Sequence, residues 1–407
     1  MDAPIDALKL AAQNVTYYPS DQFPSNLPTP STSDIALVFI TSDSGENSRT
    51  VEGNNGDRSS DGLYAWHGGD DLVKAAAAKF STVIVIVHTV GPIILERWID
   101  LPSVKGVLFA HLPGQEAGGS LTDILFGKYS PSGHLPYSII KQESDYPDSL
   151  NIRGFAFFQV QDTFSEGLYI DYRYLNKASI QPRYPFGHGL SYTTFSRTSL
   201  VLKAITPLTA FPPARKPKTT SSIPIYSSSI PSPFEVSWPT GFTKINRYLY
   251  PYIDNPASYL TTNKYDYPTG YSTIPKPDPR AGGDLGGNPA LWDVMFTLSL
   301  TVTNTGLVAG KDVVMLFVSY PPSSQAKYET PIIQLRAFEK TAMLVGGGKE
   351  NVVLSLTRKD LSVWDVVVQN WRIPEGEFVF WVGNSTEGLT VACGSGGGCS
   401  GGRVSPV

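Results

Sequence analysis

Ile35-Ala-Leu-Val-Phe-Ile40 runs directly into Thr41-Ser-Asp-Ser-Gly-Glu46, and Val51-Glu-Gly-Asn-Asn-Gly-Asp-Arg58 follows a few residues later. Six consecutive apolar residues are typical of a strand buried on both faces. The loop that follows is made of small and acidic residues. Open α/β sheets place their chemistry in such loops, beyond the carboxyl ends of the strands. The stretch therefore predicts an α/β fold with a functional loop around Glu46.

The rest of residues 1–200 repeats this alternation of helix and strand. Thr82-Val-Ile-Val-Ile-Val87 is β-branched and apolar, and the alanine-rich segment before it is a strong helix former. This βαβ rhythm predicts a doubly wound parallel sheet. The expected helices cover residues 4–13, 69–80, 92–100 and 115–126, and the expected strands cover residues 35–40, 82–87, 104–110 and 135–140.

The second half of the chain has a different character. Residues 201–290 are rich in Pro, Ser and Tyr without periodicity, which is typical of a long irregular insertion. Residues 291–386 contain several short strand-like runs, which favour an antiparallel β-sandwich. Residues 387–407 end in a Gly/Ser-rich tail, which we expect to lack regular structure.

Composition excludes some classes of partner. The 407 residues carry a net charge of −4, which gives no electrostatic basis for binding nucleic acid or an anionic membrane. No apolar run reaches the roughly 20 residues that a transmembrane helix needs. The first residues lack the basic and apolar regions of a signal peptide.

The two cysteines and the sequons bear on the compartment. Cys393 and Cys399 can close a short loop if the compartment is oxidising. The five histidines show no metal-ligand spacing, and the chain has no nucleotide-binding loop, so we expect neither a metal nor a cofactor. Asn14 and Asn384 each begin an Asn-X-Thr sequon, which permits glycosylation of a secreted protein.

A set of short motifs also occurs in order along the chain. Besides the residues of the loop, the set includes Leu112-Pro-Gly-Gln-Glu-Ala-Gly118, Phe164-Ser-Glu-Gly-Leu-Tyr-Ile-Asp-Tyr-Arg173, Tyr184-Pro-Phe-Gly-His-Gly-Leu-Ser-Tyr192 and Arg358-Lys-Asp-Leu-Ser-Val-Trp-Asp365. Together these motifs resemble the fungal β-glucosidases of glycoside hydrolase family 3. Each motif alone is weak, whereas their order over most of residues 1–385 is specific.

The resemblance implies an architecture. Members of this family resemble one another in having an N-terminal barrel, then an α/β sandwich domain, then a fibronectin type III-like domain. The barrel carries the nucleophilic Asp and most of the glucose pocket. The resemblance implies that this chain begins inside the α/β domain, so we expect no nucleophile in this chain and a missing barrel domain as its partner. It also implies β-glucosides or cello-oligosaccharides as substrates, and secretion.

Glu46 matches the position of the family's acid/base by this resemblance. A retaining glycosidase needs two carboxyl groups about 5–5.5 Å apart, one to attack the sugar and one to protonate the leaving oxygen. Because one carboxyl group cannot fill both roles, we expect the chain alone to be inactive. The family's usual Gly-Tyr after the acid is replaced here by Asn47-Ser48.

Other acidic residues favour structural roles. Glu166 and Asp171, with Tyr172 and Arg173, are expected to lock the α/β domain against its neighbours by bidentate pairing. Asp57 and Arg58 are expected to order the loop. Glu116 lies where a helix is expected to begin, and a carboxylate there suits the helix dipole.

Three functions are compatible with these patterns. The first is β-glucosidase, which hydrolyses terminal non-reducing β-D-glucosyl residues with retention during cellulose or glucan degradation. The alternative is a non-catalytic carbohydrate-associated module or pseudoenzyme that descends from the enzyme. A structural adhesion protein ranks last, because it does not explain the segment from Asp43 to Arg58.

Overall fold

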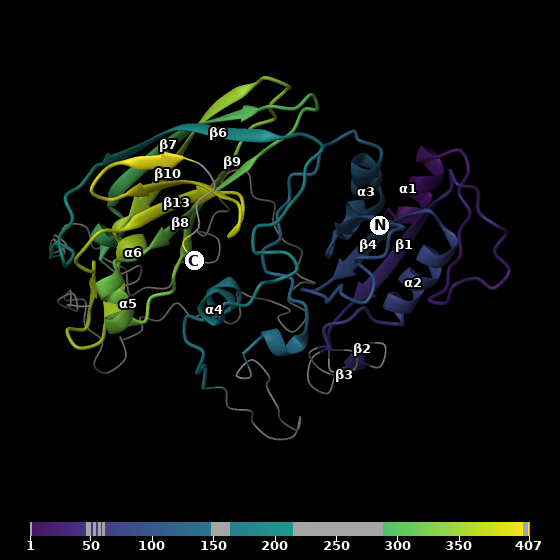
Figure 1. The fold of residues 1–407 in the computed structure, drawn as a ribbon, viewed down its shortest axis with the longest axis horizontal. Coiled ribbons are helices and arrows are strands. Elements are labelled where there is room, and N and C mark those ends of the chain that lie inside the picture. Colours follow the sequence, from purple (N-terminus) through teal and green to yellow (C-terminus); the bar gives the residue numbers. More distant parts are fainter. Residues whose placement is uncertain are drawn as a thin grey trace, which may run out of the picture. The chain divides into compact units, whose positions relative to one another are not determined.

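The structure, a computed structural model, describes residues 2–45, 50–51, 54–55, 58, 62–147, 163–214, 288–401 and 406. The chain divides into two compact units, one formed by residues 1–212 with 291–407 and the other by residues 213–290. Within the first unit, the elements up to α4 form an α/β part and the later strands form a β-sandwich (Figure 1). In the second unit, the Asn288 side chain donates a hydrogen bond to the Pro213 oxygen at 2.8 Å.

The α/β part is built on three parallel strands in the order β1-β4-β5, as the apolar runs predict. The central strand β4 has five buried residues and three partly buried ones, as its β-branched, apolar sequence predicts. Helix α2 packs on β1 and β4 and buries Val73 and Ala76. The bounds are β1 Ile35–Ser42, α2 Gly69–Lys79, β4 Thr82–Thr89 and β5 Val104–Phe109.

Two further helices pack against each other, α1 (Pro4–Ala11) and α3 (Ala117–Leu125), and the short 3₁₀ helix η1 (Gly114–Glu116) precedes α3. The contact is close because Gly118 has no side chain; a Cβ there would lie 2.6 Å from the backbone oxygen of Ala3. In Figure 1 this pair lies on the opposite side of the strands from α2. Helices on both sides of a parallel sheet are the doubly wound arrangement that the sequence predicts.

Two predicted elements are absent. Residues 92–100 form turns and not a helix, since Ile93, Ile94 and Leu95 are drawn into the core and the indole of Trp98 donates to Asp70 at 2.8 Å. Residues 135–140 form a single bridge, from Ile139 to Tyr184, and not a strand. Pro136 lies within that segment, and proline cannot donate a ladder hydrogen bond.

The β-sandwich consists of two antiparallel sheets around one apolar core. One sheet has the order β10-β7-β6 and the other β15-β14-β13-β8-β9. Along β7 and β10, buried and partly exposed residues alternate, as in strands with one covered face. The bounds are β6 Phe195–Ala204, β7 Val294–Asn304, β8 Val313–Ser319, β9 Gln334–Lys340, β10 Lys349–Thr357, β13 Val379–Gly383, β14 Leu389–Gly394 and β15 Cys399–Gly401.

Strand β8 joins the sandwich to the α/β part. Val314, Leu316 and Val318 face the sandwich core, whereas Met315 and Phe317 pack in a second cluster with Tyr172 of helix α4. The Tyr172 hydroxyl accepts a hydrogen bond from the Leu335 backbone N–H at 3.0 Å. Because both faces of β8 are covered, the two parts of the first unit share a continuous apolar contact.

The remaining elements are β2 Thr50–Val51, β3 Asn54–Asn55, η2 Glu143–Asp145, α4 Tyr172–Ala178, η7 Pro289–Trp292, α5 Pro322–Tyr328, α6 Arg358–Leu361, β11 Val363–Asp365 and β12 Asn370–Arg372.

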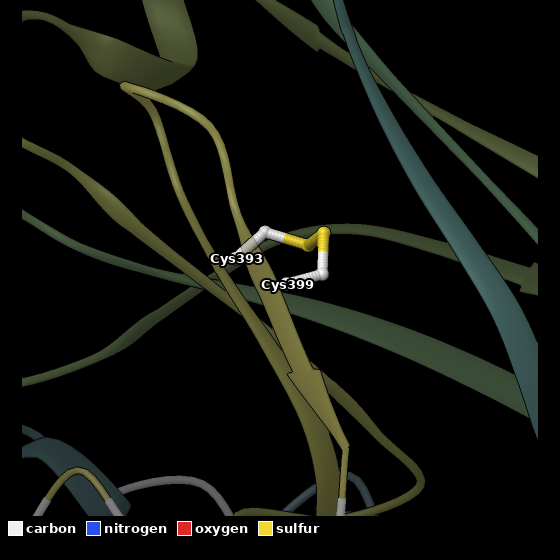
Figure 2. Close-up of a disulfide and its surroundings, with 2 residues drawn as sticks. All are labelled: Cys393 and Cys399. Atoms are coloured by element: carbon white, nitrogen blue, oxygen red, sulfur yellow. A yellow bond between two sulfur atoms is a disulfide. The ribbon is translucent and has the colours of Figure 1, made fainter.

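The two ends of the sandwich differ from the sequence prediction. Residues 195–204, placed at the junction of the α/β domain and the insertion, form the sandwich strand β6 instead. The expectation that residues after 387 lack regular structure is wrong for β14 and β15, which extend the five-stranded sheet. A disulfide joins Cys393 of β14 to Cys399 of β15, directly opposite residues of the ladder (Figure 2). The composition did not predict this strand pair, because the turn that joins the two strands is rich in glycine.

Candidate active site at the carboxyl edge of the parallel sheet

The carboxyl ends of β1, β4 and β5 lie at one edge of the sheet, because the strands are parallel. Ser42 and Thr89 are paired at this edge and are almost fully buried. The backbone N–H of Val90 donates to the Ser42 oxygen at 3.1 Å, which ties the loops that follow β1 and β4 together. The loops of an α/β sheet that carry its chemistry therefore begin from a rigid base here.

The loop after β1 is the one that contains Glu46. The structure describes its first residues, Asp43, Ser44 and the buried Gly45. Glu46, Asn47 and Ser48 lie outside the described residues, and so does Asp57 of the expected Asp57–Arg58 pair. The described part places the start of the predicted acid/base loop at the carboxyl edge of the sheet.

The return of this loop toward helix α2 is anchored by backbone and side-chain contacts. The Trp66 N–H donates to the Thr41 oxygen at 2.7 Å, so the two ends of the loop are joined. The Leu63 N–H donates to the carboxylate of Glu143 at 2.8 Å, and the Leu63 oxygen accepts from Ile94 N–H at 2.7 Å. These contacts fix the base of the loop to the neighbouring segments.

Strained backbone gathers near the same edge. Arg58, His67 and His111 adopt left-handed conformations with φ of 58°, 53° and 51°. A non-glycine residue in this region costs on the order of 1 kcal/mol or more, so it persists only where its surroundings hold it. His111 is held by a hydrogen bond of 2.7 Å between its Nε2 and the Tyr137 hydroxyl. Such strain is common at functional sites and supports this edge as the candidate site.

The titratable groups near Arg58 are mostly neutral at physiological pH. Burial raises the pKa of Tyr137 to about 12 and that of Tyr146 well above its usual range. Burial lowers the pKa of Arg58, but an arginine stays protonated at neutral pH. The Arg58 guanidinium is therefore a positive charge that interacts with two neutral phenols and with Glu143.

A hollow of about 210 Å³ lies beside strand β1. Phe39, Trp66, His67 and His88 line it, and burial lowers the pKa of His88. Asp21 is the one carboxyl side chain among the described residues that line this hollow. The described residues of the hollow therefore supply one carboxyl group, whereas glycoside hydrolysis uses two.

The segment with Glu166, Asp171, Tyr172 and Arg173 makes structural contacts, but they differ from the predicted bidentate pairing. Asp171 accepts hydrogen bonds from the Ser138 backbone N–H at 2.8 Å and from the Ser138 hydroxyl at 3.0 Å. Arg173 donates to the backbone oxygen of Leu168 at 3.4 Å and makes no bidentate pair with a carboxylate in the described part of the chain. The contact across the two parts is made by Tyr172 instead. Glu116 is exposed at the N-cap of α3, as expected for a carboxylate at a helix start.

Glu143, which the sequence did not single out, contributes to the site because it anchors the loop from a distant segment. No periodicity or spacing relates Glu143 to Glu46, so only the fold reveals this contact.

Within the described ranges, no group of three or more His, Cys, Asp or Glu side chains could hold a metal ion. None of the described helices has the length and apolarity to cross a membrane.

Family comparisons define the class of this protein. Residues 1–192 match the glycosyl hydrolase family 3 C-terminal domain, and residues 312–386 match the fibronectin type III-like domain. The chain therefore belongs to glycoside hydrolase family 3 and corresponds to the C-terminal part of its β-glucosidases.

Particular relatives are similar over nearly the whole chain. The probable beta-glucosidase F of Aspergillus fumigatus is 57% identical over 97% of this chain, and that of Aspergillus flavus is 58% identical over 98%. The chain spans about half the length of these relatives, 46% in each case. Among solved structures, beta-D-glucoside glucohydrolase from Trichoderma reesei is 34% identical, with a TM-score of 0.69 over 97% of this chain and 45% of that one.

Proposed function

We propose that residues 1–407 form the acid/base-bearing part of a retaining β-glucosidase. The observation that carries this proposal is the position of the loop from Asp43, which leaves the carboxyl edge of the sheet in a chain 57% identical to probable beta-glucosidases. Its substrates are β-glucosides or cello-oligosaccharides, and its biological role is in cellulose or glucan degradation.

In this proposal Glu46 acts twice. It first donates a proton to the glycosidic oxygen while a carboxylate from outside residues 1–407 attacks the anomeric carbon, so the aglycone leaves as a neutral alcohol. Glu46, now a carboxylate, then takes a proton from water, and the hydroxyl displaces the enzyme carboxylate with net retention. The relatives are about twice as long as this chain, so we place the nucleophile in the part that they have in addition.

The test compares this chain with a fusion in which the N-terminal part of the Aspergillus fumigatus relative precedes it. We expect the 407-residue chain alone to release no nitrophenol from an aryl β-glucoside, and the fusion to turn the substrate over. Turnover by the chain alone would mean that it holds a second catalytic carboxylate. An inactive but folded fusion would contradict the enzyme proposal and favour a non-catalytic module.

We also infer that the protein is secreted and glycosylated. The Cys393–Cys399 disulfide supports secretion, because structural disulfides persist in oxidising compartments. Asn14 is exposed, whereas the Asn384 segment packs closely against Gly187, where a Cβ would lie 2.8 Å from the Asn384 oxygen.

We therefore expect Asn14 to carry a glycan more completely than Asn384. Mass spectrometry of peptides from protein secreted by a fungal host, before and after enzymatic deglycosylation, measures both occupancies. The Asn14→Gln variant serves as the control for the first peptide. Higher occupancy at Asn384 than at Asn14 would contradict this inference.

A further inference from the structure

Strand β15 is too short to be held on the sandwich by its backbone pairing alone. It consists of three residues, Cys399–Gly401, and all three are exposed. It pairs with β14 along Val391 to Cys393, at one edge of the five-stranded sheet. The net gain from one hydrogen bond is no larger than the entropy lost when one residue is ordered. Three ladder pairs without a buried side chain in β15 therefore need further support.

The Cys393–Cys399 disulfide supplies this support (Figure 2). Cys393 is buried in β14, whereas Cys399 is exposed. The turn between them is anchored at Ser395, whose backbone N–H donates to the Phe378 oxygen at 2.8 Å. Three glycines follow Ser395, and glycine loses more conformational freedom on ordering than any other residue. The disulfide therefore offsets an entropy cost that the sequence of the turn makes large.

The position of β15 is important because this strand closes one side of the sandwich. β6 and β15 are edge strands of the two sheets, and they contact each other. We call this contact the β6–β15 seam. On the opposite side of the sandwich the edge strands β9 and β10 meet, and they have seven and nine residues. One side is thus closed by two long strands, and the other by a three-residue strand with a disulfide.

The strand on the other side of the seam, β6, is irregular. It pairs with β7, and the register of this pairing shifts between Thr198 and Val201. Ser199 in this stretch is left-handed, with φ of 56°, and Val201 is 57% exposed. An edge strand with exposed β-branched residues is a template for pairing with another chain unless a neighbour covers it. β15 is the neighbour of β6 at this edge.

We propose that the Cys393–Cys399 disulfide is a redox-sensitive switch that holds β15 in place and so keeps the β6–β15 seam closed. A dithiol opens it in two exchange steps. One thiolate of the dithiol attacks the sulfur of the exposed Cys399, and Cys393 leaves as a thiolate. The second thiolate of the dithiol then attacks the first sulfur of the dithiol, so that Cys399 leaves and the dithiol becomes a cyclic disulfide. The two cysteine thiolates take up the two protons that the dithiol has lost, and the protein gains two electrons.

Hydrogen exchange of the 407-residue chain, measured by mass spectrometry with and without dithiothreitol, tests the switch without requiring activity. A disulfide across a sequence separation of 6 favours the attached strand by roughly 40-fold. We expect reduction to speed exchange in residues 399–401 by about this factor. Exchange in β6 should also become faster, because the seam opens. Exchange in β9 and β10, on the opposite side of the sandwich, should stay unchanged.

Two variants separate the disulfide from the residues around it. Cys399→Ser should exchange like the reduced protein and should no longer respond to dithiothreitol. Ser400→Ala is the matched control, because it changes the next residue of β15 and keeps the disulfide, and it should behave like the oxidised wild type. Equal exchange of residues 399–401 in both redox states would overturn the proposal. An increase in these residues that leaves β6 unchanged would also overturn it, because the seam would then not depend on β15.

Discussion

Glu46→Gln in the fusion is expected to lower kcat/KM for cellobiose by about 10²- to 10⁴-fold, the usual contribution of a general acid or base. The amide has the size of the carboxylic acid but cannot give a proton to the leaving oxygen. The limb of the pH profile that reports deprotonation of the acid should disappear with it. Steady-state hydrolysis of cellobiose across pH measures both effects.

The dependence on the leaving group makes this prediction specific. Dinitrophenolate leaves with little protonation. For a dinitrophenyl glucoside, Glu46→Gln should therefore slow the first step much less than it does for cellobiose. Glu116→Gln is the matched control, because Glu116 is exposed at a helix start and is expected to leave the rates unchanged. An equal loss for both substrates would argue against a role as general acid.

Asp312→Asn is expected to cause a large loss of stability. Asp312, just before β8, forms a 2.5 Å ion pair with Arg197 of β6, so the pair links the two sheets of the sandwich. The two side chains are only 4% and 7% exposed. Removing one partner of a buried pair leaves a buried charge and costs about 3–5 kcal/mol. Thermal unfolding followed by circular dichroism should show a decrease in Tm of roughly 10 °C.

Two further variants distinguish this effect from a general sensitivity. The double change Arg197→Met with Asp312→Leu removes both charges and should recover much of the loss, because well-packed apolar residues can replace a buried pair. Asp123→Asn removes the partner of Lys128, whose side chain is 63% exposed, and should leave the Tm unchanged. A single Asp312→Asn variant as stable as wild type would show that the pair does not hold the sheets together.

The fold was predictable where the sequence has a clear period or an uninterrupted apolar run. The runs around Val38 and Val85 gave β1 and β4, and the alternation along residues 294–303 gave β7. The secondary-structure prediction was wrong where contacts with distant segments determine the conformation. Trp98 is fixed by Asp70, so its segment is not a helix, and β14 and β15 are joined across a glycine-rich turn.

The site was predictable only in part, for a physical reason. Glu46 is expected to be the acid/base by resemblance to the family and not from any periodic signal, and it lies outside the described residues, so its role stays a prediction. Asp57 and Arg58 were expected to order the loop as a pair. Arg58 donates a hydrogen bond to Pro92, whereas Asp57 lies outside the described residues, so the pair stays a prediction. Glu143 carries no signal in the sequence, because the contact that it makes with Leu63 joins segments 80 residues apart.

The most direct test of the role of Glu46 is azide rescue of the Glu46→Ala fusion with an activated aryl β-glucoside. If Glu46 is the acid/base, azide occupies the space left by the side chain and attacks the glucosyl-enzyme from the face that water uses. The product is then β-glucosyl azide, with retention, as nuclear magnetic resonance would show. Formation of α-glucosyl azide would instead make Glu46 the nucleophile. An unchanged rate without azide would remove Glu46 from the reaction and contradict the account.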